Sequence, residues 1–164
     1  MNIIMMGPPG SGKSTQAELI AKDLGISLIN VGDLLYFKSK EESREGRKIA
    51  EVMESGELVD DEATLILVSQ HLKGKEHRKG VVIDGYPRSL WQAENFKLPL
   101  NRVIYLVVSD AANKKRLLVR GRKDDTDELI DKRLALYHSR TEPILDYYRK
   151  LGILLEFDGA RPVN

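Results

Sequence analysis

The sequence predicts an α/β fold in which helices flank a parallel β-sheet. Short apolar runs, typical of buried strands, alternate with segments whose apolar residues recur at helical spacing. Between the first apolar run and the first helical segment lies the stretch Gly-Pro-Pro-Gly-Ser-Gly-Lys-Ser-Thr at residues 7–15. It fits the phosphate-loop pattern of Gly, four residues, Gly, Lys and then Ser or Thr, in the strand–loop–helix context that the motif requires. We therefore expect the chain to bind a nucleotide phosphate near its N-terminus.

The phosphate-loop residues offer three kinds of contact to an anion. Glycines let the backbone wrap closely around it, the N-terminus of the following helix presents unpaired N–H groups, and Lys13 adds a positive charge. Ser14 or Thr15 can offer a hydroxyl to Mg²⁺. The alternative is a glycine-rich turn that binds nothing, but two glycines, a lysine and a hydroxyl in register argue against it.

The composition excludes several classes of protein. A chain of 164 residues suits one compact domain with a small insertion. Its 26 Lys and Arg residues nearly balance its 25 Asp and Glu residues, so charge gives no argument for a nucleic-acid or membrane partner. Cysteine is absent, which excludes disulfides and thiolate metal sites. The sequence has no apolar run of about 18 residues and its start lacks the features of a signal peptide, so we expect a soluble cytoplasmic protein.

The first third of the chain predicts two strands, the helix between them and a helical insertion. Residues 2–6 are apolar and branched enough for a buried strand, and the helix after the phosphate loop stops at Gly25. Residues 26–29 predict a second strand, and Asp33 is placed to cap the helix that follows. A charged stretch then gives way to helical spacing that ends at Gly56, which predicts a small helical insertion.

The middle of the chain predicts a strand that ends in an acid. A helix begins at residues 60–62, and the basic run at 74–79 predicts a solvated surface turn. Residues 81–84 form a short apolar run ending in Asp84, and Ser89 is placed to cap the next helix. After a phosphate loop, an acid at a strand end is the expected form of the Mg²⁺-directing strand, although such an acid is as often a cap. We favour the metal role for Asp84 because the phosphate loop accompanies it.

The last third predicts two more strands separated by helices. Residues 103–108 are the clearest buried strand, and the next helix begins at Ser109 or Asp110, has residues 117–119 on its apolar side and ends at Gly121. Two elements complete the pattern: a long helix from residue 126 that is interrupted at 141–143, and a strand at 153–157.

Four blocks of the sequence together resemble adenylate kinases in order and spacing. Asp-Gly-Tyr-Pro-Arg at residues 84–88, with Gln92 four residues after the Arg, is narrowly tied to that family. The other blocks are the phosphate loop, Gly-Asp-Leu-Leu at residues 32–35, and Arg-Lys-Asp-Asp at residues 122–125 with Arg133. The resemblance covers essentially the whole chain.

The resemblance implies a three-layer P-loop kinase fold with a five-stranded parallel sheet. It implies a single domain over residues 1–164, with a helical AMP-binding insertion at about 30–59 and a minimal lid at about 120–126. The implied activity is Mg²⁺-dependent transfer of the terminal phosphoryl group of ATP to AMP, which gives two ADP. A kinase for another nucleoside monophosphate is one alternative, although Gln92 argues for adenine. A nucleotide-binding regulator with weak catalysis is the other.

The resemblance also implies roles for individual residues. The catalytic set is Lys13, Arg88, Arg120, Arg122 and Arg133. The ATP-binding set is Gly10, Ser11, Gly12, Lys13, Ser14, Thr15, Arg116, Arg120 and Arg161. The AMP-binding set is Val31, Tyr36, Val59, Gly85, Arg88 and Gln92. The Mg²⁺ set is Ser14, Asp84 through water, and Asp33 in the outer shell.

Simple chemistry agrees with a catalytic set made of cations. The phosphate of AMP is already an anion at neutral pH, so the transfer needs no general base, and the barrier falls through alignment and charge neutralisation. Without the phosphate loop, arginines on helix faces would more simply be solvated or paired with nearby acids.

Three features depart from the family pattern. Tyr36 stands where an arginine is usual and Val31 where a threonine is common, which predicts weaker contact with the AMP phosphate. Only Gly121 separates Arg120 from Arg122, so the lid is hardly more than a turn and donor use should be broad. The sequence ends at Asn164, where relatives usually continue with a helix, so we expect an exposed apolar patch on a monomer or weak homo-oligomer.

Overall fold

The computed structural model describes residues 1–161, and its centre is a five-stranded parallel sheet with the strand order β2-β3-β1-β4-β5. The strands are β1 (Asn2–Met6), β2 (Ser27–Asn30), β3 (Val81–Asp84), β4 (Arg102–Val107) and β5 (Leu154–Asp158). All the predicted strands form, and their ends agree with the sequence prediction to within one residue. The α/β fold class with a five-stranded parallel sheet is therefore confirmed.

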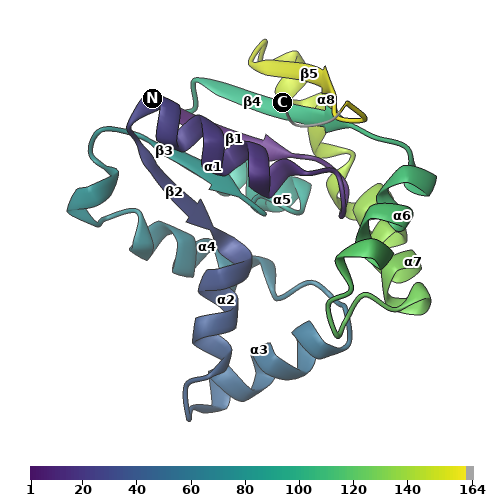
Figure 1. Ribbon diagram of the computed structural model, residues 1–164. Coiled ribbons are helices and arrows are strands. Elements are labelled where there is room, and N and C mark those ends of the chain that lie inside the picture. The colour runs from purple at the N-terminus through teal and green to yellow at the C-terminus, as the bar shows by residue number, and fades with distance from the viewer. Residues whose placement is uncertain (162–164) are drawn as a thin grey trace.

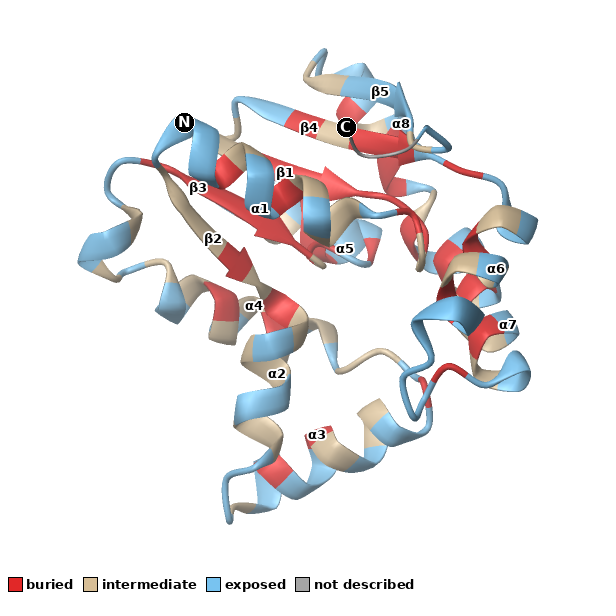
Figure 2. Ribbon diagram, in the orientation of Figure 1, coloured by how far each residue is buried: buried red, intermediate tan, exposed pale blue. Residues whose placement is uncertain are grey.

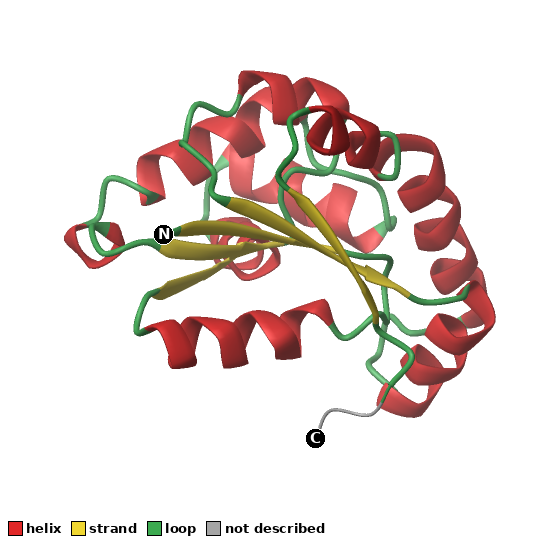
Figure 3. Ribbon diagram, turned by 90° about the horizontal axis from the view of Figure 1, so that it is seen from above, coloured by secondary structure: helices red, strands yellow, loops and turns green. Residues whose placement is uncertain are grey.

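Helices cover both faces of this sheet because each central strand is apolar on both sides. Ile3 and Met5 face α1 (Lys13–Leu24), which packs through Ala17 and Ala21. Figure 3 shows α1 alone against this face, with most other helices on the opposite side. Small alanines allow close approach of helix and sheet, and Gly25 ends α1 in the left-handed conformation, as predicted.

The opposite face of the sheet holds the larger hydrophobic core. Ile4 and Met6 point to this face, where they join residues of α4 (Asp61–His71), α5 (Leu90–Asn95) and α8 (Ile144–Lys150). Ser89 caps α5, as the sequence predicted, and Asp60 caps α4, which begins within the predicted residues 60–62. The central strands are buried along most of their length, whereas the outer strand β5 is largely exposed (Figure 2).

A pair of helices, α2 (Val31–Ser39) and α3 (Arg44–Glu54), extends away from the sheet (Figure 1). The prediction that Asp33 caps α2 is wrong. The cap is Asn30, whose Oδ1 accepts a hydrogen bond of 3.1 Å from the backbone N–H of Asp33. Because α2 begins directly where β2 ends, the cap falls three residues earlier, and Asp33 lies in the first turn.

A second helical pair follows β4 and consists of α6 (Asp110–Arg120) and α7 (Asp127–Leu136). Ser109 and Thr126 cap these helices, and Gly121 ends α6 in the left-handed conformation. Leu117 packs against α7, but Leu118 and Val119 are exposed, so the prediction that all three form a buried side is wrong. Figure 1 shows that α6 lies beside the sheet rather than on it. Only a narrow stripe of its side chains is therefore buried. The long helix is interrupted as predicted, by a π-helical segment at Tyr137–Thr141 before α8.

Two surface features complete the description. The basic turn predicted at residues 74–79 contains a short 3₁₀ helix, η1 (Lys75–His77), and it is not wholly solvated, because the His77 side chain is only 5 % exposed. Leu155 and Phe157 on β5 are exposed. In the described residues, no helix combines the length and apolar character needed to span a membrane.

Candidate active site

The loop between β1 and α1 has the shape of an anion cradle. Gly10 and Gly12 have φ angles of +84° and +87°, a left-handed region that side chains rarely tolerate. At Gly10 a Cβ atom would lie 2.6 Å from the carbonyl oxygen of Asn113, so only glycine fits there. The backbone N–H of Ser11 donates to Pro8 across the loop at 3.1 Å. The N-terminal N–H groups of α1 therefore stay available for an anion.

The end of β3 supplies a buried carboxylate beside this loop. The Ser14 hydroxyl donates to Asp84 Oδ2 at 2.5 Å, and the Asn30 amide donates to the same oxygen at 3.3 Å. Asp84 is 3 % exposed, and within residues 1–161 its Oδ1 has no hydrogen-bond partner. Ser14, rather than the exposed Thr15, is thus the hydroxyl at this acid. A carboxylate with a free buried oxygen and a neighbouring hydroxyl fits the oxygen-rich coordination that Mg²⁺ prefers.

Cations gather around Asp84. The pKa of Lys13 is lowered to about 8, chiefly by desolvation; the charge of Asp84 opposes this shift, and the charges of Arg88 and Arg120 contribute to it. The Lys13 ammonium donates to the carbonyl of Pro8 at 3.4 Å. Because Lys13, Arg88 and Arg120 come from separate parts of the sequence, their mutual influence indicates that the fold concentrates positive charge at this point. Such a field favours a polyanionic ligand.

Arg88 is held in place by the turn that follows β3. Its Nε donates to the carbonyl of Gly85 at 2.9 Å, and its backbone N–H donates to Gln92 Oε1 at 2.7 Å. Thr141 donates to the Arg88 carbonyl at 2.9 Å. A Cβ on Gly85 would lie 3.2 Å from Arg88 Nη2, so a glycine at that position leaves room for the guanidinium. The buried Gln92 therefore has a positioning contact that sequence reasoning did not anticipate.

The predicted arginine cluster forms around a second buried acid, Asp125. Its side chain is fully covered, and its two oxygens accept hydrogen bonds of 2.8 and 2.6 Å from Nε and Nη2 of Arg120. The backbone N–H of Arg122 donates to the same carboxylate at 3.1 Å. Arg133 lies 3.7 Å from Asp125 and also pairs with Asp124. Hydrogen bonding from Arg120 lowers the pKa of Asp125 below its ordinary value. The Arg122 side chain is exposed.

Arg116 joins the phosphate loop to the end of β5. Its guanidinium donates to the carbonyls of Gly159 at 2.9 Å, Ala160 at 3.2 Å and Ser11 at 3.4 Å. A hollow of about 540 Å³ opens at this junction, and Arg116 and Arg161 both line it with Gly12 of the loop. Its apolar wall includes Ile20, Ile104 and Phe157, which sequence reasoning did not single out. A flat apolar ligand beside a phosphate would suit this hollow.

The remaining predicted residues lie on or near the α2–α3 pair. Val31 is buried at the start of α2, Val59 is partly exposed, and Asp33 is exposed. The Tyr36 side chain is 50 % exposed, and the Lys40 ammonium lies 4.8 Å from the centre of its ring. The hydrogen bonds found in residues 1–161 do not connect Tyr36 or Asp33 to Arg88 or Asp84.

The α2–α3 pair also contacts α7. Lys132 on α7 donates to the carbonyl of Ser55 at 2.8 Å and forms an ion pair with Glu57 at 2.7 Å. Gly56 packs beside Leu129, where a Cβ would come within 3.3 Å of a Leu129 methyl group. The helical insertion is therefore joined to the helix that carries Arg133.

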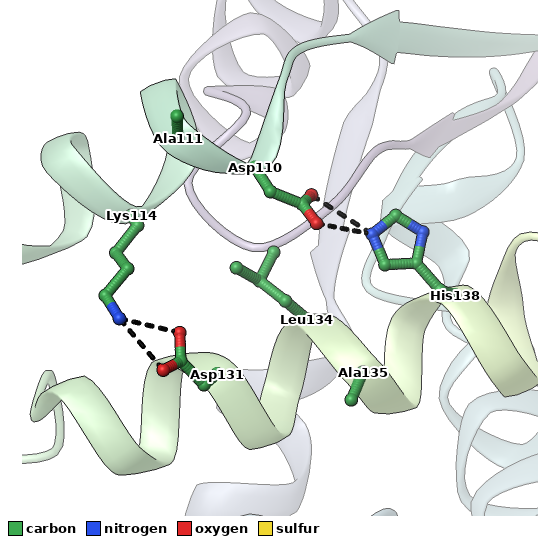
Figure 4. Close-up of a pocket in the computed structure, with 7 residues that line it drawn as sticks. All are labelled: Asp110, Ala111, Lys114, Asp131, Leu134, Ala135 and His138. Carbon is green, nitrogen blue, oxygen red and sulfur yellow. Dashed lines mark hydrogen bonds and ion pairs between the residues drawn. The ribbon is translucent and has the colours of Figure 1, made fainter.

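A second hollow, of about 320 Å³, lies between α6 and α7 and contains none of the predicted site residues. Figure 4 shows Lys114 paired with Asp131 on one side and His138 paired with Asp110 on the other. His138 also contacts Glu142 at 2.7 Å through its other ring nitrogen. Hydrogen bonds to Glu142 and Asp110 raise the pKa of His138. These ion pairs form a seam that fastens α6 to α7.

The chain is similar to known proteins along almost its whole length. A family model described as "Adenylate kinase" matches residues 5–153. The chain is 40 % identical over 169 residues to an adenylate kinase of Prochlorococcus marinus strain MIT 9211, with 99 % of this chain and 90 % of the relative covered. An adenylate kinase of Leuconostoc mesenteroides is 40 % identical over 168 residues, which cover 98 % and 89 % of the two chains. One from Nocardia farcinica is 34 % identical over 171 residues, which cover 100 % and 93 %.

Proposed function

Since the chain belongs to the adenylate kinase family, we propose that the site at the phosphate loop transfers the terminal phosphoryl group of ATP to AMP and releases two ADP. The observation that carries this proposal is the phosphate loop beside the buried carboxylate of Asp84, whose charge acts on both Lys13 and Arg88. Phosphoryl transfer of this kind depends on positioning and charge neutralisation rather than on a covalent intermediate.

ATP would bind with its phosphates on the loop and its base toward β5. Loop residues 10–15 supply backbone N–H groups, and the Lys13 ammonium neutralises phosphate charge. Arg116 and Arg161 line the adjoining hollow, whose apolar wall suits a nucleotide base. These positions support the ATP-binding set implied by the resemblance.

Mg²⁺ would bind beside the phosphates, where Ser14 and Asp84 lie. The Ser14 hydroxyl would bind the ion, Asp84 would hold it through water, and Asp33 would lie in the outer shell. The free Oδ1 of Asp84 supports this assignment because a buried carboxylate oxygen needs a partner. When bound, the ion neutralises charge on the transferring phosphoryl group.

AMP would bind between the α2–α3 insertion and the turn after β3. The Arg88 guanidinium can form two parallel charge-assisted bonds with its phosphate, and Gln92 and Gly85 lie in the same turn. Val31, Tyr36 and Val59 would form the insertion side of the site. The contact of Lys132 with Ser55 supports a coupling between this insertion and α7.

Residues 120–126 would act as a minimal lid. Arg120, Arg122 and Arg133 stabilise the phosphoryl group during transfer, and Asp125 holds two of them in register before the nucleotides bind. No general base is required, because the AMP phosphate attacks as an anion.

A coupled assay of ADP formation with ATP and each nucleoside monophosphate tests this function. AMP should be the best acceptor, and Lys13→Ala should lose kcat by a factor of about a hundred or more while keeping its fold, since a lysine in a loop contributes little to the core. A better rate with CMP or UMP would identify a different monophosphate kinase. Turnover no faster than slow ATP hydrolysis with every acceptor would instead identify a regulator.

The cellular setting and assembly are also proposals. We propose a cytoplasmic monomer or weak homo-oligomer, because the exposed Leu155 and Phe157 on the outer strand β5 offer apolar surface for self-association. Sedimentation at several protein concentrations tests the assembly, and cell fractionation tests the compartment.

A further inference from the structure

Two histidines and a glutamate gather at the edge of the sheet opposite the phosphate loop. His71 ends α4, and Glu76 and His77 belong to η1, just before β3 begins (Figure 1). The potential ligand atoms of these three residues all lie within 4.8 Å of one another. Because β2 and β3 start at this edge and the phosphate loop follows the end of β1, the cluster is separate from the nucleotide site.

The backbone brings the cluster together through a series of tight turns. Gly74 donates to the carbonyl of His71 at 3.1 Å, and His77 donates to the carbonyl of Gly74 at 3.2 Å. These bonds fold η1 back onto the end of α4, so that the two imidazole centres lie 5.1 Å apart. A Cβ at Gly74 would lie 2.3 Å from Glu76 Oε1, so the glycine leaves space for the Glu76 carboxylate.

His77 directs an unpaired nitrogen toward the other two residues. Its side chain is 5 % exposed, and its Nδ1 lies 2.7 Å from the hydroxyl oxygen of Ser27. The Ser27 hydroxyl donates its proton to the carbonyl of Gly80 at 3.0 Å. Since a hydroxyl has one proton, we assign the hydrogen of the neutral His77 ring to Nδ1, from which it is donated to Ser27. Nε2 then bears a lone pair, and it has no hydrogen-bond partner among residues 1–161.

We propose that His71, Glu76 and His77 bind one divalent transition-metal ion of the Zn²⁺ class. Two imidazole nitrogens and one carboxylate oxygen form a known donor set for Zn²⁺, with water as the fourth ligand. Glu76 Oε1 and His77 Nε2 are 3.4 Å apart. Two ligand atoms of a tetrahedral Zn²⁺ site are separated by roughly the same distance, given bonds of about 2.1 Å. The exposed His71 and Glu76 side chains can adjust to close the remaining gap.

The surroundings agree with this assignment. Ser27 fixes the ring of His77 by accepting from its far nitrogen, as outer-shell partners of metal-bound histidines do. Burial lowers the pKa of His77, which favours the neutral imidazole that a metal requires. The neighbouring basic side chains are exposed, so solvent screens their charge: Lys73, Lys75, Arg78 and Lys79.

The other histidine in the chain does not form an equivalent site. His138 contacts Asp110 through Nε2 and Glu142 through Nδ1. These nitrogens lie on opposite sides of the ring, so the two acids and the histidine cannot share one ion. His138 is therefore a matched control for the histidines of the cluster.

A bound ion would fasten the end of α4 to the start of β3. Its free energy of binding would add to the stability of the fold, because the folded chain fixes the ring of His77 and turns η1 back onto the end of α4. The site is distant from the phosphate loop, so this inference does not depend on the proposed function.

Calorimetric titration with ZnCl₂ alone tests the proposal on the full chain, after removal of metals with a chelator. Excess Mg²⁺ is present to occupy sites made only of oxygen. We expect one equivalent to bind, and His71→Asn and Glu76→Gln each to weaken binding about tenfold or more. The controls His138→Asn and Glu18→Gln should bind Zn²⁺ like the wild type; Glu18 is an exposed residue of α1. Equal Zn²⁺ affinity in the wild type and in the His71→Asn/Glu76→Gln double variant would overturn the proposal.

Two further measurements report on the site by means other than the heat of binding. Nitrogen-15 NMR of the metal-free protein should show His77 in the Nδ1–H form. Addition of Zn²⁺ should then change the chemical shift of His77 Nε2. Finding the Nε2–H form in the metal-free protein at neutral pH would contradict the argument. Zn²⁺ should also raise the Tm of the wild type reversibly, with no such shift in the double variant. An equal shift in both proteins would place the ion elsewhere.

Discussion

Asp125→Asn is the substitution that most directly tests how the arginine cluster is held. The Asp125 carboxylate is fully covered and accepts two hydrogen bonds from Arg120 and one from the backbone of Arg122. Asparagine keeps the shape and one oxygen acceptor. Its NH₂ group, however, would face a guanidinium that can only donate, so both bonds cannot be restored.

The expected loss of stability follows from these contacts. Each charge-assisted hydrogen bond is worth about 1.5–3 kcal/mol. The Arg120 side chain is 39 % exposed, so water replaces part of the interaction when the carboxylate is removed. We therefore expect the free energy of unfolding to fall by about 2 kcal/mol, which lowers Tm by about 4–8 °C in a domain of this size.

The effect should depend on pH in a defined direction. The pKa of Asp125 is lowered in the folded state, chiefly by the hydrogen bond from Arg120. Its stabilising contribution is therefore fully present above the unfolded pKa of about 3.9 and is lost as the pH falls through the folded value. The difference in unfolding free energy between wild type and Asp125→Asn should be constant from about pH 7 to pH 5 and should shrink below about pH 4.

Urea unfolding at several pH values, combined with the coupled ADP assay, measures both consequences. We expect kcat to fall at least about tenfold, because Arg120 and Arg133 lose the group that aligns them. Asp127→Asn is the matched control: its carboxylate is 71 % exposed and pairs with Lys114, so the unfolding free energy should change by less than about 0.5 kcal/mol. The reasoning would be refuted if Asp125→Asn were as stable as the wild type. It would also be refuted if the difference in unfolding free energy between the two proteins persisted below about pH 4.

Four further predictions concern the acceptor site, the α6–α7 seam and the lid. Arg88→Lys should raise the KM for AMP about tenfold or more, because an ammonium cannot make two parallel bonds to phosphate; an unchanged KM would remove Arg88 from the site. Tyr36→Arg should lower the KM for AMP several-fold with little change in kcat. Lys40→Ala should raise the KM for AMP in the wild type but not in the Tyr36→Arg variant. A KM for AMP that does not change in Tyr36→Arg would contradict the idea that Lys40 compensates for the arginine missing at position 36. The pKa of His138 is raised in the folded state, so its stabilising contribution is complete below about pH 6.5 and is lost as the pH rises through the folded pKa. The free energy of unfolding of the wild type should therefore decline above pH 6.5. His138→Asn should not show this decline. Because the proposed lid at residues 120–126 is so short, GTP, CTP and UTP should each support AMP phosphorylation within about tenfold of ATP. A preference for ATP near a thousandfold would contradict this.

Much of the fold could be predicted because its signals are local. Strand runs, the caps Ser89, Ser109 and Thr126, and the helix-ending Gly121 are encoded within a few residues of where they act. The cap of α2 was misplaced because Asn30 and Asp33 are both good capping residues, and their choice depends on where β2 ends. That end is set by pairing with β3, which no local pattern reveals.

The sequence predicted which residues belong to the candidate site more completely than it predicted the contacts between them. The phosphate loop and the arginines follow from motifs, but the contacts that hold them join residues far apart in sequence. Ser14 and Asp84 are 70 residues apart, and Asn30 and Asp84 are 54 apart. The second contact could have been found from topology, because Asn30 and Asp84 are register partners at the ends of neighbouring parallel strands.

The two buried acids of the site, Asp84 and Asp125, differ in whether a carboxylate oxygen remains without a hydrogen-bond partner. This difference suits their proposed roles. Asp125 is saturated by hydrogen bonds from Arg120 and Arg122, so it can orient arginines but has no vacant oxygen with which to bind a cation. Asp84 has one oxygen occupied by Ser14 and Asn30, whereas its Oδ1 is buried without a partner in the described chain. A buried unpaired oxygen is costly in the resting protein, and a hydrated ion repairs that cost when it binds. We therefore expect Mg²⁺ with nucleotide to stabilise the wild type more than an Asp84→Asn variant, whose amide gives the ion no negative charge to bind.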